Sequence, residues 1–458
     1  MKVTDTIAAI ATGITDAGVG IIRVSGKEAI SIVDGIFKPA KKNSVKQMKS
    51  YTAAFGHVVE KGEILDEAIV LVMKAPNTYT REDVVEIQCH GGIVIMQRVL
   101  ESVIRAGARV AEPCEFTKRA FLNGRIDMSQ AESVMDMIHA KNEYSVKASM
   151  MQLRGELSDE IKRLREKILY HVAYIESSLD DPEHYSLDGY LEKLQNDTIE
   201  ILGQVRHLML SADNGKIIKE GIKTVIVGKP NAGKSSLLNV LLGEERAIVT
   251  EIAGTTRDIL MESVNMDGIS LNIMDTAGIR NTSDVLEKMG VDRAKSNMDD
   301  ADLILYVVDS SRELDENDFD IINRIQDKNV IILFNKQDLK VVVDKVYLVS
   351  LLNKKTVDFS AKSRQGLSEL FSIIKDMFFH GELKFNNEIY ITNMRHKNAL
   401  MNAKKSLQSV LDSIDQNMPE DFFSIDLMNA YEELGYIIGE SLEDDLVDKI
   451  FSEFCMGK

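Results

Sequence analysis

Hydrophobic and polar residues follow three different patterns along the 458-residue chain. Residues 1 to about 120 contain short apolar runs between Gly-containing turns, such as "GVGIIRVSG" and "EDVVEIQCHGG", which predict β-strands. From Asp127 to about Ala212 glycine and proline nearly vanish, and stretches such as "ELSDEIKRLREKILYHVAYIESSL" carry apolar residues at helical spacing. We expect Asn214-Gly215 to end this helical region.

The pattern changes twice more after residue 218. Up to about residue 380, β-rich strands alternate with helices, which predicts a parallel α/β sheet. From about Ile389 the helical spacing returns, with one helix in "MRHKNALMNAKKSLQSVLDSI", a second after Pro419 and a third that starts at Ser441 with a capping-box pattern. We therefore predict an α/β domain inserted into a helical domain.

The chain is too long for one core and is expected to form a multidomain α/β protein. An α+β N-terminal domain would cover residues 1–120. A discontinuous all-α helical domain would be formed by residues 121–217 and 381–458. Residues 218–380 would form an inserted Ras-like P-loop domain with a mostly parallel sheet.

Composition narrows the class of protein. The net charge of −17 makes the chain a poor stand-alone nucleic-acid binder, because phosphate neutralisation supplies most non-specific affinity. A nucleic acid would therefore be bound largely through a partner. No apolar run approaches the roughly 20 residues of a membrane span. The three cysteines, Cys89, Cys114 and Cys455, are too few for a disulfide framework, which favours a reducing, cytoplasmic location, and we expect Cys89 and Cys114 to be small buried side chains.

The chain ends in "FCMGK", in which Cys455 has the spacing of a prenylation box. Gly457 and Lys458 do not fit the residue types that such a box requires. A lipid anchor is therefore not expected, and the thiol needs another explanation.

The strongest motif is "GKPNAGKS", residues 228–235, which matches the P-loop pattern between an apolar strand and a helix. Its glycines let backbone N–H groups surround phosphate, and the helix N-terminus favours negative charge. Lys234 is expected to reach the β- and γ-phosphates, and the Ser235 hydroxyl is expected to ligate Mg²⁺.

Three further motifs indicate GTP rather than ATP. In "NKQD" (Asn335–Asp338), the Asp338 carboxylate can accept both N1–H and N2–H of guanine, a donor pair that adenine lacks. "SAK" (residues 360–362) can cover the base. "DTAG" (residues 275–278) would bring Asp275 near Mg²⁺. These motifs together predict a GTPase domain.

The position after "DTAG", where Ras-like proteins carry a water-orienting Gln, is occupied by Ile279. Hydrolysis therefore needs another polar group, and Arg280, Asp284 and Glu287 are the nearby choices. The segment "TEIAGTTRD" (residues 250–258) offers backbone oxygens that could hold a monovalent cation, whose charge could replace an arginine finger.

These motifs, with "DTIAAIAT", "EFTKRAFLNGRIDMSQAE", "IAGTTRD" and the terminal Cys-x-Gly-Lys, resemble the MnmE (TrmE) family of tRNA modification GTPases along the whole chain. The resemblance implies a homodimer whose GTPase domains associate across GTP and are activated by K⁺. It implies K⁺ positions at Asn231, Thr250, Ile252 and Thr255, and Mg²⁺ positions at Ser235 and Thr256. It makes Glu287 the residue that orients the attacking water, and gives Lys234 and Cys455 catalytic roles. The nucleotide-binding positions would be Asn231, Ala232, Gly233, Lys234, Ser235, Ser236, Thr250, Glu251, Ile252, Ala253, Gly254, Thr255, Thr256, Asp275, Thr276, Ala277, Gly278, Asn335, Lys336, Gln337, Asp338, Ser360, Ala361 and Lys362.

The resemblance also implies a folate site in the N-terminal domain. Positions matching the contacts to 5-formyl-tetrahydrofolate are Arg23, Glu86, Arg125 and Lys458. Together with the FAD enzyme MnmG, the family places an aminomethyl or carboxymethylaminomethyl group on C5 of the wobble uridine of certain tRNAs. The alternative is a regulatory GTPase switch in ribosome assembly, a class that shares the P-loop and "DTAG" motifs but usually carries a second GTPase domain or a basic RNA-binding domain.

Overall fold

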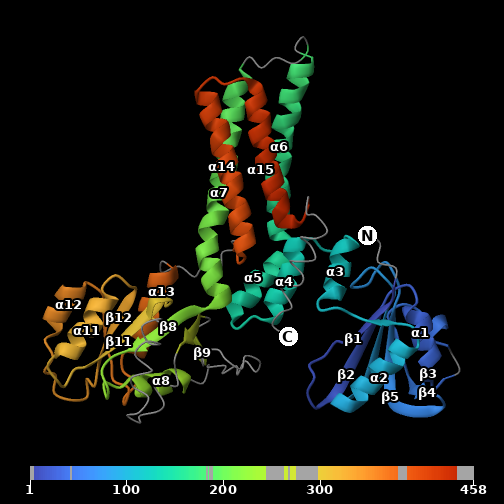
Figure 1. The fold of residues 1–458 in the computed structure, drawn as a ribbon, viewed down its shortest axis with the longest axis horizontal. Coiled ribbons are helices and arrows are strands. Elements are labelled where there is room, and N and C mark those ends of the chain that lie inside the picture. The colour runs from blue at the N-terminus through green and yellow to red at the C-terminus, as the bar shows by residue number, and fades with distance from the viewer. Residues whose placement is uncertain are drawn as a thin grey trace. The chain divides into compact units, whose positions relative to one another are not determined.

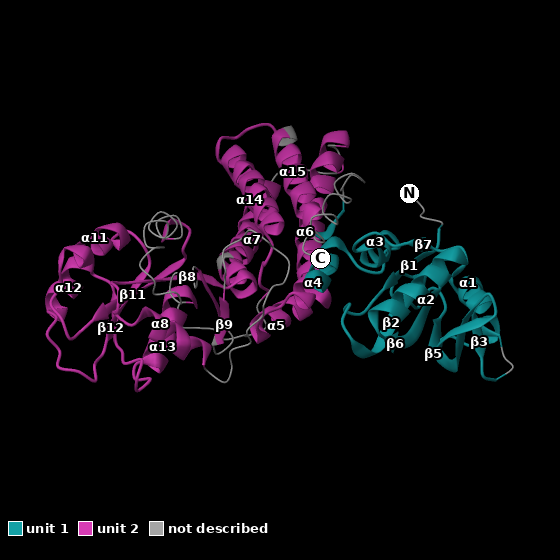
Figure 2. Cartoon of the chain, turned by 60° about the horizontal axis from the view of Figure 1, so that its bottom comes forward, with its two compact units in different colours: residues 1–135, 438–458 teal, residues 136–437 magenta. Residues whose placement is uncertain are grey.

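The computed structural model (Figure 1) describes residues 5–41, 44–181, 184, 189–243, 262–266, 269–274, 298–379 and 389–440. The chain forms two compact units, coloured separately in Figure 2. One contains residues 1–135 and 438–458, and the other contains residues 136–437.

The first unit is built on a seven-stranded sheet with the order β3-β4-β5-β6-β2-β1-β7, in which only β1 and β7 are parallel neighbours. Along β5, Ala68, Val70 and Val72 are buried and alternate with more accessible residues, the period of a strand with one covered face. Helices α1 and α2 supply apolar side chains to the same core. The elements are β1 (Ile7–Ile10), β2 (Ala17–Ser25), α1 (Ala29–Ile36), β3 (Phe37–Pro39), η1 (Val45–Gln47), β4 (Thr52–Glu60), β5 (Glu63–Met73), β6 (Val84–Gly91), α2 (Ile93–Arg105), β7 (Arg109–Val110) and α3 (Glu115–Leu122).

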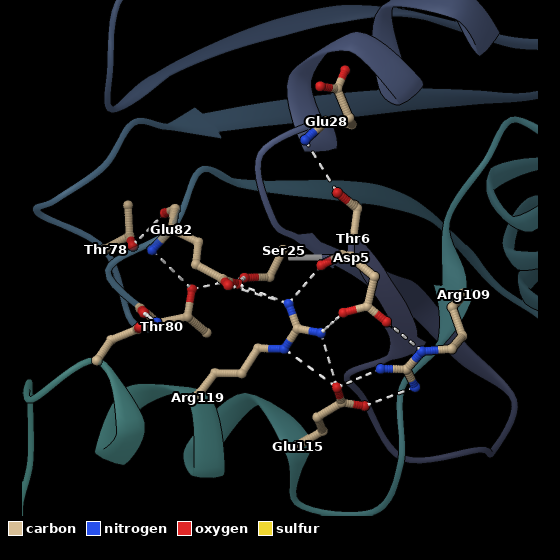
Figure 3. A network of polar contacts seen from close by, with 11 residues as sticks. Asp5, Thr6, Ser25, Glu28, Thr78, Thr80, Glu82, Arg109, Glu115 and Arg119 are labelled. Atoms are coloured by element: carbon tan, nitrogen blue, oxygen red, sulfur yellow. Dashed lines mark hydrogen bonds and ion pairs between the residues drawn. The ribbon is translucent and has the colours of Figure 1, made fainter. Parts of the chain in front are cut away.

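Helix α3 is fixed to the sheet by Arg119, whose side chain is only 1% exposed (Figure 3). Its guanidinium lies 2.8 Å from Asp5 Oδ1, 3.2 Å from Glu82 Oε1 and 2.9 Å from Glu115 Oε1. Arg109 adds a second guanidinium, 2.7 Å from both Asp5 Oδ2 and Glu115 Oε1. A buried charge is tolerated only when it is paired and hydrogen-bonded, so this network determines where the helix can sit.

Helices from both sides of the P-loop domain form one bundle in the second unit. Helix α14 packs against α7, and from α15 the Tyr431 carbonyl accepts a hydrogen bond of 3.1 Å from Arg165 Nε of α6 (Figure 1). The fold therefore contains the predicted discontinuous helical domain, and α14 and α15 confirm two of the three helices predicted in its second part. The third, predicted to start at Ser441, lies outside the described residues. The helices of this region are α5 (Glu143–Leu153), α6 (Glu156–Asp180), α7 (Tyr190–Glu220), α14 (Met394–Asp415) and α15 (Glu420–Ile438), and α4 (Met128–Ile138) begins in the first unit and ends in the second.

The prediction that Asn214-Gly215 ends the helical region is wrong. Helix α7 continues through these residues to Glu220 and stops at Gly221, whose φ of +82° ends the helix. Gly215 has a packing role instead, because a Cβ built on it would lie 2.2 Å from the Ile391 carbonyl oxygen. The missing side chain lets the returning chain pass directly against the helix.

The P-loop domain has a six-stranded sheet with the order β13-β12-β11-β8-β10-β9, parallel except for the β9–β10 pair. Strands β11 and β12 are buried along their whole length, as expected of parallel strands covered on both faces. Residues of α8 and α13 belong to one core cluster, and residues of α11 and α12 belong to the other. The elements are β8 (Ile222–Val227), α8 (Lys234–Leu242), β9 (Glu262–Met266), β10 (Ile269–Ile273), β11 (Leu303–Asp309), α11 (Glu316–Ile325), β12 (Val330–Asn335), α12 (Lys345–Leu352), β13 (Lys355–Asp358) and α13 (Leu367–Phe379).

Candidate functional site

The P-loop connects the end of β8 to the start of α8, as the sequence predicts. Gly233 is the residue before the helix and has a φ of +107°, and a Cβ on it would lie 2.0 Å from Asn335 Nδ2. Glycine is therefore needed for both backbone conformation and space. Lys234 Nζ donates to the carbonyl oxygens of Gly228 (2.7 Å) and Lys229 (2.8 Å). The loop leaves backbone N–H groups and a lysine at the N-terminus of a helix, which is the arrangement of a phosphate site.

Asn335 joins three of the predicted nucleotide-binding loops. Its side chain is buried, its Nδ2 donates to Ala232 O at 2.8 Å, and its Oδ1 accepts from Ala361 N at 3.2 Å. Asp338 is exposed, and its Oδ1 accepts from Ser360 Oγ at 3.0 Å. The carboxylate is thus held in place while oxygen lone pairs remain that can accept from the edge of a base.

The other described P-loop and guanine-loop residues lie on the same edge of the sheet. Lys336 Nζ lies 2.6 Å from Asp309 Oδ2 at the end of β11. Burial raises the pKa of Asp309, but hydrogen bonds from Lys336 and Ser311 outweigh it, and the net pKa shift is downward. Asn231 is exposed with a φ of +64°. The remaining predicted residues are Ser235 and Ser236 in the first turn of α8, Gln337 beside Lys336, and Lys362, which is exposed.

Sequence reasoning missed Lys229, the residue after the first P-loop glycine. Its Nζ lies 2.6 Å from Asp318 Oδ2 and 2.9 Å from Asp315 Oδ2, both at the start of α11. Asp318 is buried and also accepts from Tyr306 OH at 3.1 Å. Burial acts to lower the pKa of Lys229, but the hydrogen bonds to the two carboxylates outweigh it and raise the pKa. Lys229, at a position that the P-loop motif leaves unspecified, therefore connects the P-loop to a helix some 90 residues later in the chain.

The structure gathers three predicted folate residues of the first unit around Tyr79. Arg23 Nη2 lies 2.8 Å from Glu86 Oε1, on adjacent strands β2 and β6. The guanidinium carbons of Arg23 and Arg125 lie 5.7 Å and 4.8 Å from the centroid of the Tyr79 ring. Phe116 contacts Arg23 in the same way at 5.6 Å. The two aromatic residues were missed, because nothing in their local sequence distinguishes them from core residues.

The other predicted site residues lie outside the described residues, and the structure does not test them. They are Thr250, Glu251, Ile252, Ala253, Gly254, Thr255, Thr256, Asp275, Thr276, Ala277, Gly278, Glu287, Cys455 and Lys458.

The thiol of Cys89 is buried and donates to Gly20 O at 3.6 Å. Burial and the nearby Asp66 carboxylate raise its pKa to about 11, which keeps it protonated and inert at neutral pH. Cys114 is only half-buried. Of the two cysteines predicted to be buried, the prediction is therefore confirmed for Cys89 and wrong for Cys114. In the part of the chain that the structure describes, no cluster of His, Cys, Asp and Glu could hold a metal ion. None of the described helices is long and apolar enough to span a membrane.

Two family models match most of the chain between them. The model described as the GTP-binding protein TrmE N-terminus matches residues 6–125, and the MnmE helical domain matches residues 128–455. The chain is 54% identical over 456 residues to a "tRNA modification GTPase MnmE" of Lachnoclostridium phytofermentans, covering 99% of this chain and 100% of the relative. It is 46% identical over 461 residues to the protein of the same name in Alkaliphilus oremlandii, with complete coverage of both chains.

Among solved structures, the G domain of the T. maritima FeoB iron transporter is 26% identical and covers 34% of this chain and 97% of its own. Its TM-score of 0.27 is too low to support a structural argument.

Proposed function

The chain belongs to the MnmE family of tRNA modification GTPases, and from this premise we propose how its GTP hydrolysis serves modification of a tRNA wobble uridine. The product is an aminomethyl or carboxymethylaminomethyl group on C5, built from a folate-derived one-carbon unit. The observation that carries the proposal is full-length identity of 54% to a tRNA modification GTPase, in a chain that also assembles a P-loop and a guanine-binding loop.

In the nucleotide site, backbone N–H groups at the start of α8 hold the phosphates, and Lys234 neutralises the charge that develops on the γ-phosphoryl oxygens. Its ammonium group, which donates to two P-loop carbonyls, needs only to turn toward the phosphate. Asp338 accepts the guanine N1–H and N2–H. Glu287 orients the attacking water, since the preceding Ile279 cannot.

Mg²⁺ and K⁺ fit the types of donor at this site. Mg²⁺ takes hard oxygen ligands, and Ser235 and Thr256 would supply hydroxyls. K⁺ would be held by Asn231, Thr250, Ile252 and Thr255. The Asn231 side chain is exposed, on a P-loop backbone with a φ of +64°, so it is accessible to a cation. When bound, the two cations neutralise charge on the phosphates. The remaining nucleotide contacts are those of residues 232–236, 250–256, 275–278, 335–338 and 360–362.

A formylated tetrahydrofolate fits the residues around Tyr79. The molecule combines a flat ring system with hydrogen-bonding edges and a carboxylate tail. Tyr79 and Phe116 offer aromatic faces, Arg23 and Arg125 offer cations, and Glu86 offers an acceptor. Lys458 and Cys455 would reach this site from the C-terminus, the cysteine as acid, base or nucleophile in the uridine chemistry.

The working assembly is a homodimer that associates with the FAD enzyme MnmG in the cytoplasm. The net charge of −17 favours a partner that supplies much of the positive surface for tRNA.

The function is tested in cells that lack this protein. Total tRNA is digested and the C5-modified wobble uridine is quantified by mass spectrometry. We expect the modified nucleoside to disappear and to return when the gene is restored. Unchanged levels would leave a regulatory role in ribosome assembly as the better explanation.

The hydrolytic assignment is tested with Glu287→Ala. This variant should bind GDP normally and lose K⁺-stimulated hydrolysis, because only the transition state needs the oriented water. Full activity of the variant would assign the water to another residue.

A further inference from the structure

The third residue of "NKQD" is left open by the motif, yet in this protein its side chain is fixed by several contacts. Gln337 Nε2 donates to Ser310 Oγ and to Phe334 O, both at 3.0 Å. Its backbone N–H donates to Phe359 O at 3.3 Å. Gln337 therefore connects the loop after β12 to the loops after β11 and β13.

Lys345 adds a further connection between the loops after β12 and β13. Its Nζ donates to Gln337 Oε1 at 3.3 Å and lies 2.6 Å from Asp358 Oδ1, at the last residue of β13. The lysine spans the two loops that carry Asp338 and Ser360, which contact each other at 3.0 Å.

The position of Lys345 is itself determined by packing. It is the first residue of α12, directly after Asp344, whose side chain accepts from Tyr347 N and caps the helix. Leu348 and Leu352 of the same helix are buried in the core of the domain. The Lys345 side chain is 28% exposed, so most of its stem is covered. A fixed helix thus holds an ammonium group between two loops.

We propose that Lys345 is a positioning residue for guanine recognition, which acts through Gln337 and Asp358 to set the place of the Asp338 carboxylate. The inference rests on the proposed guanine site. Lys345 does not touch the nucleotide. Its role is to keep Asp338 where the carboxylate can accept from both N1–H and N2–H of the base.

The physical reason is geometric. Two hydrogen bonds from one carboxylate to a rigid base edge tolerate little displacement, since hydrogen bonds weaken steeply as their angles depart from linearity. Without Lys345, Gln337 Oε1 and Asp358 lose a shared donor, and, among the residues that the structure describes, the two loops keep only the hydrogen bonds of Ser360 to Asp338, Ala361 to Asn335 and Gln337 N–H to Phe359. The contact to the exocyclic 2-amino group is the one that discriminates guanine from hypoxanthine.

The test compares binding of GDP and IDP, which lacks the 2-amino group, by displacement of a fluorescent GDP analogue from the full-length protein. Lys345→Met keeps the apolar stem and removes the ammonium group. We expect its Kd for GDP to rise roughly threefold to tenfold, with a smaller rise for IDP, so that the GDP preference falls. A merely structural role would weaken both nucleotides equally.

Lys354→Met is the matched control. Lys354 Nζ donates to Lys328 O at 2.7 Å at the opposite edge of the sheet, so its removal should change neither Kd nor preference. Lys345→Arg should recover most of the GDP preference. Gln337→Leu removes the acceptor of the Lys345–Gln337 hydrogen bond. The double variant with Lys345→Met should lower the GDP preference no further than the more strongly affected single variant does.

An unchanged GDP preference in both Lys345→Met and Gln337→Leu would overturn the proposal. Asp338→Asn separates this failure from failure of the guanine site. If Asp338→Asn loses the GDP preference while the other two variants keep it, only the role of Lys345 is wrong. If Asp338→Asn also keeps it, the guanine site itself has been misassigned.

Discussion

Replacing Gly215 by alanine should destabilise the helical bundle, although alanine is the better helix former. In an exposed helix interior this exchange stabilises by roughly 1 kcal/mol. At Gly215 the new methyl group would lie 2.2 Å from the Ile391 carbonyl oxygen and 2.7 Å from its carbon. Backbone atoms at both sides of this contact must separate by about 1 Å to reach ordinary van der Waals distance.

The cost of that separation exceeds the gain. Overpacking in a well-packed region costs about 1–3 kcal/mol. Moving Ile391 also stretches the hydrogen bond from its backbone N–H to Ser211 Oγ, now 3.2 Å, which contributes about 1 kcal/mol. We expect Gly215→Ala to lower the free energy of unfolding by roughly 1–3 kcal/mol after the helical gain is subtracted.

The same helix provides the control. A Cβ on Gly203 would meet no atom within 4 Å, so Gly203→Ala should gain about 0.5–1 kcal/mol. The assay is thermal melting of the helical circular dichroism signal, with both variants and the unchanged protein measured side by side. At about 2–4 °C per kcal/mol, a difference of roughly 1.5–4 kcal/mol between the two variants corresponds to a difference in Tm of roughly 3–16 °C. Equal stabilisation by both substitutions would refute the packing explanation for Gly215.

Three other predictions follow from contacts described above. The pKa of Asp5 is lowered, chiefly by the hydrogen bond from Arg109; burial raises that of Glu115, but its hydrogen bonds give a net lowering. The stability that these carboxylates contribute is therefore present above about pH 4 and is lost as the pH falls through their folded-state pKa values, which denaturant titrations at pH 3 and pH 6 would detect. Asp318→Asn should destabilise the protein by roughly 2 kcal/mol in chemical denaturation, because the ion pair with Lys229 is mostly buried; an unchanged midpoint would contradict this. Gly233→Ala should weaken GDP binding more than about tenfold in a titration, because φ is +107° and the methyl group would overlap Asn335; near-normal affinity would show that the loop adapts.

The places of the P-loop and of "NKQD" in the fold were predictable from sequence, because each motif is contiguous in the chain. "GKPNAGKS" and "NKQD" follow buried strands, and the parallel sheet brings the ends of those strands to one edge. The helices α14 and α15 were predictable from apolar spacing alone.

The supporting contacts were not predictable, because each joins residues that are distant in sequence. Lys229 meets Asp318, Arg119 meets Asp5, and these pairs occupy positions where any polar residue would satisfy the local pattern. Gly215 was misjudged for a related reason. Glycine after asparagine indicates a helix end when only neighbours in sequence are considered, whereas the reason for this glycine is the backbone of Ile391.

The division of the bundle has a consequence for synthesis on the ribosome. Helix α7 ends at Glu220 and α14 begins at Met394, roughly 170 residues later. At about 5–20 residues per second, the first half of the bundle waits roughly 9–35 s for its partner helices. During this interval α7, which packs against α14 in the finished protein, lacks that surface. The P-loop domain can fold first, so the nascent chain passes through a stage that carries a completed nucleotide-binding module beside an exposed apolar helix pair, a surface suited to chaperones.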